Sequence, residues 1–436
     1  MTIQTKERAM QMFKRLDRTL VVVGALALVL AATPAGAQVF VQCPGDTNGN
    51  SVEDGGESWP ANQQCFHLAA GDGFARMADG SPSYIFSFTD LNGLVSAPTS
   101  PTDAQGNTDA QNRVLEAGML AAAWPAPTIV MYEGAEAYLT LTNVGMMIRP
   151  DLFDAHTVHF HGHPNMATVF DGLPESGLSI NMGASLSYYY KITEPGTYMY
   201  HCHVEATEHM QMGMLGNLYV TPAQDGTPHS YDGKTYSQFV YNDGDGSTGY
   251  DRAYPIQLGS FDWDFHNASW TVQPLPFADM KDEYFMINGR GYPDTVIPGT
   301  MAAQPLDPDT GEDLNGPVDS QEVSSLITAL PGERVLLRVS NLNVTTENTL
   351  MSPSIPMTVV GRDAKQLLNP AGDPLYYQTN SVTMGGGMSY DVMLDIPTTA
   401  LSGETYFLYS SNLYQLANHD ESEAGLGGML TEIVIQ

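Results

Sequence analysis

Basic residues are scarce in this chain, and their scarcity narrows the partners that the protein can bind. Only 17 lysines and arginines stand against 49 aspartates and glutamates, which gives a formal net charge of −32 at pH 7. Nucleic acids and anionic lipids are bound through clusters of positive charge, so the composition argues against both. The acidity favours cationic partners such as metal ions or basic redox proteins. The alternative is a solvated acidic surface suited to a salty or extracellular setting.

Cysteine is also rare, with three residues in the whole chain. Cys43 and Cys65 bracket a short acidic loop, and we expect them to form a disulfide in an oxidising compartment. Cys202 is then left without a partner. For this lone thiol we favour metal ligation over a buried structural role.

Long apolar runs are missing after the N-terminal region, so the sequence predicts no membrane span. Residues 1–37 are typical of a secretory signal: basic residues precede an apolar run over residues 20–32, and Ala35-Gly36-Ala37 is a small-residue cleavage site. We therefore expect a secreted or periplasmic protein that begins near Gln38 after cleavage.

The loop between Cys43 and Cys65 has the spacing of an EF-hand calcium loop. Oxygen-bearing side chains stand at positions 1, 3, 5, 9 and 12 of that pattern, namely Asp46, Asn48, Asn50, Asp54 and Glu57. Ser51 replaces the usual turn glycine, and no helical pattern flanks the loop. Calcium is therefore one interpretation, and a polar loop closed by the disulfide is the other.

Histidine, by contrast, is concentrated in two runs. Seven of the eleven histidines lie within residues 156–163 and 201–209. Type 1 copper prefers a thiolate, two imidazoles and a weak axial thioether. The chain offers one such set: His156, Cys202, His209 and Met214.

Strand alternation explains the rest of the pattern. Successive side chains on a strand point to opposite faces, so His201 and His203 face away from Cys202. His159 and His161 share the same two-residue step and are expected on that outer face. His156 is out of phase with them and needs a local bend to reach Cys202. Asp171 and Glu205, which lie near these runs, are interpreted as loop carboxylates.

These runs resemble those of the multicopper oxidases, whose last copper domain carries His-Pro-x-His-x-His-Gly-His and later His-Cys-His-x-x-x-His before Met or Leu. Here the second run departs from the pattern, because His209 follows His203 by six positions instead of four. The resemblance is strong over residues 125–222. It implies that electrons pass along His201, Cys202 and His203 from the type 1 copper to type 2 or type 3 copper at four outer histidines: His159, His161, His201 and His203.

Short alternating runs bounded by glycine and proline predict an all-β chain. Together with the resemblance, they indicate two cupredoxin-like Greek-key β-sandwich domains. A weak internal repeat supports two copies of one fold: residues 133–143 are echoed by 331–341, and residues 196–203 by 404–411. The second copy lacks copper ligands, and residues 355–361 are matched with the first histidine run.

The expected organisation follows from these patterns. Residues 38–120 are an extension or the start of the first sandwich, 121–222 its copper-binding core, 223–250 a linker, and 251–436 the second sandwich. Residues 236–241 are a candidate strand within the linker. Whether residues 38–120 join the first sandwich or cap it stays open.

Three functions compete at this stage. The first is a laccase-like copper oxidase that takes electrons from a small molecule, metal ion or redox protein and reduces dioxygen. Its family uses eight histidines for a trinuclear copper cluster, four from each of two domains, and the second domain here offers only His266 and His419. The second is a trimeric enzyme similar to copper nitrite reductase, with a neighbour's His266 or His419 completing the outer site. The third is an electron carrier or copper-storage protein.

Overall fold

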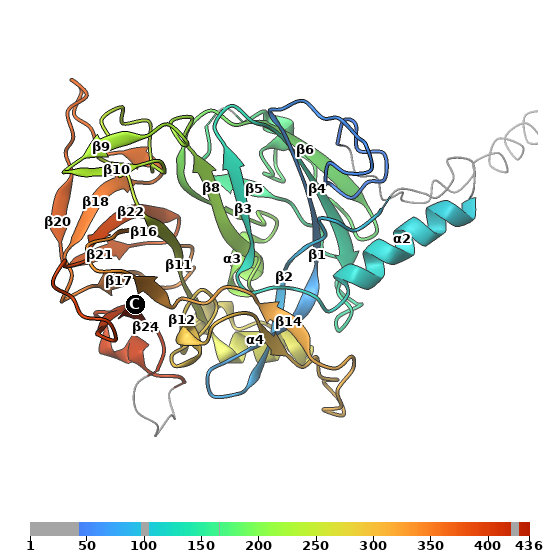
Figure 1. Cartoon of the computed structure of the whole chain (residues 1–436). Coiled ribbons are helices and arrows are strands. Elements are labelled where there is room, and N and C mark those ends of the chain that lie inside the picture. The colour runs from blue at the N-terminus through green and yellow to red at the C-terminus, as the bar shows by residue number, and fades with distance from the viewer. Residues whose placement is uncertain (1–42, 97–103, 165, 420–426) are drawn as a thin grey trace, which may run out of the picture. The chain divides into compact units, whose positions relative to one another are not determined.

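The computed structural model describes residues 43–96, 104–164, 166–419 and 427–436, and the predicted signal peptide lies outside the described residues. Residues 39–436 form one unit of the chain. Strands of the N-terminal half gather at the right of Figure 1, and those of the C-terminal half at the left. Both groups are β-sandwiches, which confirms the predicted all-β class.

The first sandwich is built from two four-stranded sheets. One has the order β2-β1-β4-β6 and the other the order β3-β8-β7-β5. Alternation builds the core, since Leu139 and Leu141 of β4 are fully buried and share one apolar cluster with Leu218 of β8. The strands are β1 (Gln63–Arg76), β2 (Pro82–Asp90), β3 (Ala126–Tyr132), β4 (Glu136–Gly145), β5 (His159–His161), β6 (Ser185–Lys191), β7 (Gly196–His201) and β8 (Leu215–Thr221).

The segment before residue 120 belongs to this sandwich. Strand β1 pairs in parallel with β4 and antiparallel with β2, so both early strands extend the first sheet. The predicted disulfide between Cys43 and Cys65 is confirmed, with the two Cα atoms 6.0 Å apart, and it ties the start of the described chain to β1. Strands β1 and β2 are therefore part of the first sandwich, while the boundary expected at residue 120 stays a prediction.

The second sandwich has a larger sheet, β12-β11-β16-β22-β18-β19 with β20 beside β18, and a smaller one, β15-β24-β23-β17-β21. Its own apolar cluster includes Val335, Leu337 and Val392. The strands are β11 (Arg252–Phe261), β12 (Tyr284–Ile287), β15 (Ile327–Ala329), β16 (Arg334–Asn341), β17 (Asn348–Met351), β18 (Met357–Arg362), β19 (Lys365–Gln366), β20 (Tyr377–Thr379), β21 (Ser381–Met384), β22 (Met388–Asp395), β23 (Thr405–Ser410) and β24 (Leu430–Ile435).

The internal repeat is borne out by the strand pairing. Strand β11 runs parallel to β16 as β1 runs parallel to β4, and β23 lies between β24 and β17 as β7 lies between β8 and β5. One detail of the repeat is wrong. Residues 355–361 fall largely on β18, which pairs with β22 in the other sheet, so the place of the first histidine run is taken by β17.

Two small hairpins lie outside the main sheets: β9 (His229–Tyr231) with β10 (Lys234–Tyr236), and β13 (Met301–Ala303) with β14 (Val318–Gln321). The first of them occupies the predicted linker. It ends at Tyr236, so the strand expected over residues 236–241 is wrong. The domain boundaries at residues 120, 222 and 250 stay predictions.

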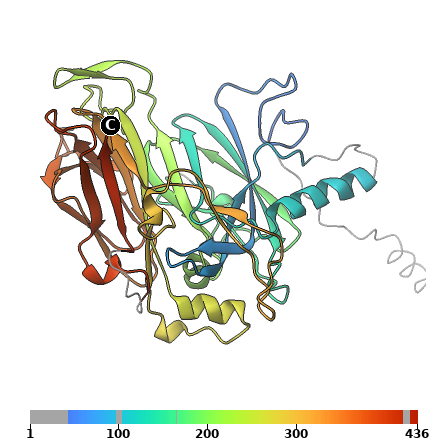
Figure 2. The ribbon, with the colours of Figure 1, turned by 60° about the horizontal axis from the view of Figure 1, so that its bottom comes forward.

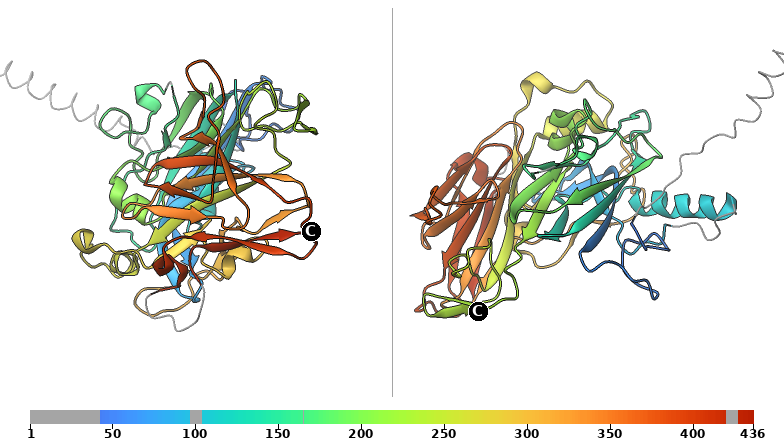
Figure 3. Two further views of the ribbon diagram at one scale, coloured as in Figure 1. Left: turned by 90° about the vertical axis from the view of Figure 1, so that its left-hand side faces the viewer. Right: turned by 90° about the horizontal axis from the view of Figure 1, so that it is seen from above.

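Within the described ranges, helices are few and short. They are α2 (Ala104–Gly118), α3 (Ala206–Gln211) and α4 (Trp263–Trp270), with single 3-10 turns η1 (Thr168–Phe170), η2 (Phe277–Asp279), η3 (Asp294–Val296) and η4 (Leu413–Leu416). Figure 3 shows α2 on the side of the first sandwich that is remote from the second, and Figure 2 brings α4 forward at the bottom. Among the described residues, no helix has the length and apolarity that crossing a membrane requires.

A buried polar network joins the two sandwiches. Thr197 of β7 donates a hydrogen bond to Asp391 of β22 at 2.6 Å, and Arg338 of β16 donates to Thr197 at 3.0 Å. The carboxylate of Asp391 is fully buried, and Tyr241 donates to it at 2.5 Å. Because buried charges are costly unless they are paired and hydrogen-bonded, this network fixes how β7 lies on the second sandwich.

Candidate metal centre

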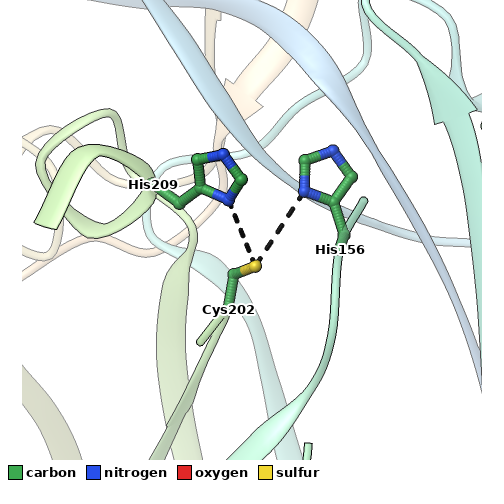
Figure 4. A group of neighbouring side chains, drawn as sticks. All are labelled: His156, Cys202 and His209. Carbon is green, nitrogen blue, oxygen red and sulfur yellow. Dashed lines mark hydrogen bonds between the residues drawn. The ribbon is translucent and has the colours of Figure 1, made fainter. Parts of the chain in front are cut away.

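The inner cluster joins one thiol and two imidazoles from three separate segments. Cys202 follows β7, His209 lies on α3, and His156 precedes β5. The Sγ atom of Cys202 lies 3.2 Å from Nδ1 of His209 and 3.9 Å from Nδ1 of His156, and the three side chains point toward one another (Figure 4). All three residues are 0% exposed, so they form a dry group of soft and borderline donors.

Backbone hydrogen bonds hold these residues in place. The N–H of Cys202 donates to the carbonyl of Met214 at 3.1 Å, and the N–H of Met214 donates to the carbonyl of His209 at 2.8 Å. Met214 is itself fully buried. His156 exchanges two backbone hydrogen bonds with Ile180, at 3.0 and 2.9 Å, which supplies the bend that strand alternation requires.

The long step from His203 to His209 forms a helix. Helix α3 begins after Glu205, whose φ of 44° is left-handed, and the N–H of His209 donates to the Glu205 carbonyl at 3.1 Å. The turn of helix carries His209 back over Cys202. The sequence indicated a longer loop at this point but gave no sign of a helix.

Electrostatics favour a thiolate at the inner cluster. Burial alone would raise the pKa of the Cys202 thiol, but the imidazoles of His209 and His156 outweigh it and hold that pKa well below its ordinary value. Burial lowers the pKa of His156, which keeps this ring neutral and able to donate a lone pair. Burial would lower the pKa of His209, but Cys202 and Asp154 raise it to about 10, so His209 has to lose a proton before it ligates a metal together with the thiolate.

Asp154 belongs to this site, and the sequence interpretation missed it. Its Oδ2 lies 3.8 Å from Nε2 of His209, on the side of the ring away from Cys202. Contact with His209 lowers the pKa of the Asp154 carboxyl. The only signal in the sequence was its place two residues before His156.

The outer cluster lies on the opposite face of β7. His159 and His201 stand opposite each other in the β5–β7 register. The Nδ1 atom of His159 lies 2.6 Å from the Asp171 carbonyl, and Nδ1 of His201 lies 2.8 Å from the Cys202 carbonyl. A ring that donates from Nδ1 presents Nε2 to a metal. The ligand nitrogens of His159, His161 and His201 all lie within 4.8 Å of one another.

His203 completes this group of rings, with centroids 5.3 Å from His159 and 5.6 Å from His201. The four histidines that alternation assigned to the outer face are therefore neighbours. Burial lowers the pKa of His201 to about 3 and also lowers that of His161, so both rings are neutral at pH 7. Asp171, interpreted from the sequence as a loop carboxylate, orients His159 through its backbone carbonyl.

A cavity of about 450 Å³ opens in front of the outer cluster. One wall is formed by the four histidines together with Ala206 and Met210 of α3. The facing wall comes from the second sandwich and is lined by Leu342, Asn343, Val344, Gly386 and Gly387. The only side chain on that facing wall with polar atoms is Asn343.

Residues 105–225, which hold both clusters, match the family model described as multicopper oxidase. The chain is 26% identical over 304 residues to copper resistance protein A from Pseudomonas syringae pv. tomato, a match that covers 66% of this chain and 43% of the relative. Residues 105–225 are thus similar to the multicopper oxidase family. The chain spans less than half the length of the copper resistance proteins that it matches.

Solved structures agree on the fold of both sandwiches. The blue copper oxidase from Nitrosomonas europaea superimposes with a TM-score of 0.56 at 19% identity, covering 86% of each chain. A copper nitrite reductase from the same organism gives 0.51 at 17% identity, covering 86% of this chain and 94% of the other. At such identities the likeness concerns the cupredoxin fold alone.

The inner donor set fits copper, because a thiolate, two imidazoles and a buried thioether-bearing residue are the ligands that type 1 copper takes. The outer histidines do not fit the eight-imidazole trinuclear cluster that the resemblance implied. His266 and His419, the two candidates in the second sandwich, lie elsewhere.

His266 is 1% exposed and points into the protein. Its Nδ1 lies 2.6 Å from the Tyr84 carbonyl and its Nε2 lies 2.9 Å from the Gln211 carbonyl, at the end of α3. His419 pairs with Glu283 at 3.5 Å beside Tyr284. A neighbouring chain therefore cannot receive His266, which corrects that part of the nitrite-reductase interpretation.

The remaining histidines are also placed away from both clusters. His67 is buried with Nε2 2.9 Å from Oγ1 of Thr142, His229 packs on Phe239, and His163 lies between Phe160 and Tyr198.

In the disulfide loop, backbone N–H groups donate hydrogen bonds to the carboxylate of Asp46. The amides of Gly49 and Ser51 donate to it at 2.5 and 2.8 Å. Ser51 adopts the left-handed φ of 61° that the turn position demands. Calcium at this loop stays a prediction.

Proposed function

We propose that this chain is a copper-dependent oxidoreductase that takes electrons from a reductant at the Cys202 cluster and passes them to the outer histidines. The observation that carries the proposal is the covalent link between the clusters: Cys202 ligates on one face of β7, while His201 and His203 on either side of it reach the other face. Copper bound at the two clusters supplies one-electron redox chemistry.

The two clusters, on opposite faces of β7, have different roles in this proposal. The inner cluster is 0% exposed and leaves no room for a substrate, so it serves electron entry. The outer cluster borders the 450 Å³ cavity, where a small acceptor molecule has space to bind. The Nδ1 contact of His201 with the Cys202 carbonyl adds a hydrogen-bonded route beside the covalent one.

Dioxygen is the acceptor that the similarity to the multicopper oxidase family supports. Nitrite is the second candidate, supported by the three outer imidazoles and by the fold that the chain shares with a copper nitrite reductase. A pure electron carrier has no use for the outer histidines and their cavity. Small molecules, metal ions and redox proteins are all proposed electron donors, in a secreted or periplasmic setting that the disulfide supports.

Substitution of the thiolate tests the proposal. We expect Cys202→Ser to remove the blue charge-transfer band and all oxidase activity, because serine supplies no thiolate. We expect His201→Ala with His203→Ala to keep the blue band and lose turnover. The matched control is His419→Ala, which removes an imidazole outside both clusters and should change neither readout. Turnover in the Cys202→Ser variant would contradict the proposed electron entry.

A further inference from the structure

We infer that the outer site is a single-copper site for a small ligand, and not a trinuclear cluster: His159, His161 and His201 hold the metal, and Asn343 of the second sandwich donates a hydrogen bond to the ligand. This inference rests on the proposed function and narrows it. It follows from the number of histidines at the site and from the residues of the second sandwich that lie opposite them.

The supply of imidazoles limits the number of metal ions. Of the eleven histidines, His156 and His209 serve the inner cluster and four form the outer one. The other five lie elsewhere, two of them fully buried on other partners: His67 and His266. Within the described chain, the outer site is therefore offered four imidazoles and not the eight of a trinuclear cluster.

The chain's own second sandwich also faces the histidines at close range. A Cβ built on Gly387 would lie 2.7 Å from Nε2 of His161, so a side chain at this position would collide with the ring. Gly387 has a φ of 86°, which disfavours any other residue there. Position 387 therefore cannot supply a metal ligand opposite His161.

Three converging imidazoles suit one copper ion with an open position. The ligand nitrogens of His159, His161 and His201 all lie within 4.8 Å of one another, a set that does not include His203, although its ring centroid lies 5.3 Å from that of His159. The open position faces the cavity, because the same residues line it.

Asn343 gives the cavity its ligand chemistry. Its Nδ2 is buried and has no hydrogen-bond partner among the described residues, which is costly unless a ligand supplies one. The side chains around it, Leu342, Val344 and Met210, are apolar. An amide donor among apolar side chains, on the wall that faces the histidines, fits a small molecule with an oxygen or nitrogen lone pair, such as nitrite, azide or dioxygen, and disfavours a phenol or a peptide.

The first test is the copper content of the full, copper-loaded chain, with its visible and electron paramagnetic resonance spectra. We expect two copper ions per chain, one with a type 1 signal and one with a type 2 signal of equal intensity. Four copper ions with a spin-coupled, signal-silent pair would overturn the inference while leaving the proposed function intact. A chain without a type 1 signal would instead contradict the proposed function. One copper ion with a type 1 signal alone would contradict the outer site.

The second test addresses Asn343 through azide and nitrite titrations that follow the type 2 signal and need no turnover. Asn343→Leu keeps the shape and removes the donor, and we expect about tenfold weaker binding, since a hydrogen bond to a charged group is worth about 1.5 kcal/mol or more. The type 1 spectrum should not change. His419→Ala is the control and should bind both anions like the unaltered chain. Equal affinity in Asn343→Leu would refute the role of the amide.

Discussion

At the scale of single residues, Asp154 stands between the inner cluster and solvent. Its side chain is 21% exposed, whereas His209 beside it is fully buried. The carboxylate therefore places a negative charge near the buried imidazole without filling the cluster. Negative charge stabilises the oxidised, more positive state of a nearby metal.

This placement predicts the effect of Asp154→Asn. Removing the charge should raise the reduction potential of the blue copper by tens of millivolts, where ~59 mV corresponds to a tenfold change for a one-electron couple. Redox titration of the blue band measures the shift. Asp309→Asn, which removes an exposed carboxylate from the β13–β14 hairpin, is the control. An unchanged potential in Asp154→Asn would show that the carboxylate does not act on the site.

At the scale of elements, α3 depends on the second sandwich for its position. His266 of α4 reaches the Gln211 carbonyl, and the Gln211 side chain donates to Asp282 at 3.3 Å. Ser260 donates in turn to Asp282 at 2.5 Å. The helix that carries His209 is therefore clamped at its C-terminal end by residues that carry no copper.

We predict that His266→Ala loosens this clamp. Loss of a buried ring with two polar contacts should cost about 2–4 kcal/mol in unfolding free energy, and the loosened helix should broaden the type 1 resonance. Chemical unfolding and electron paramagnetic resonance measure the two effects. Asn267→Ala, an exposed position on the same helix, is the matched control. A sharp, unshifted resonance in His266→Ala would mean that α3 keeps its position without the His266 contact.

The local sequence pattern predicted which side chains share a face of a strand better than it predicted which residues of the two sandwiches lie next to each other. Strand alternation alone placed Cys202 and His201 on opposite faces of β7, and the out-of-phase His156 required the bend that Ile180 provides. Asn343 and His266 escaped prediction because their roles depend on how one sandwich lies on the other. That arrangement is fixed by buried contacts between distant segments, such as Arg338 with Thr197, which no local spacing encodes.

At the scale of the whole molecule, buried neutral histidines make the free energy of unfolding depend on pH. Burial lowers the pKa values of His67, His163 and His266 to about 4 each, against an ordinary value of 6.5. Between pH 6.5 and 4 these histidines bind protons in the unfolded chain but stay neutral in the folded protein. These rings therefore stabilise the fold fully above pH 6.5, and that contribution is lost as the pH falls toward 4.

His67 allows a test of this coupling away from both clusters. His67→Gln keeps a polar group near Thr142 and does not titrate. Stability should fall between pH 7 and pH 4.5 by about 2 kcal/mol less in the variant than in the unaltered chain, because one proton uptake is removed. Urea unfolding at the two pH values measures the difference. The same pH dependence in both proteins would contradict a neutral buried ring at this position.

The distribution of site residues along the chain also sets an order of assembly in time. The thiolate and both imidazoles of the inner cluster are encoded by residues 156–209, whereas the facing wall of the outer cavity comes from residues 342–344 and 386–387. During synthesis the soft-metal ligands emerge from the ribosome long before the segments that close the cavity. A nascent chain thus presents the thiolate and imidazoles of the inner cluster before the cavity for a substrate has formed. The compartment in which the chain first meets metal ions therefore decides which ion the inner cluster binds.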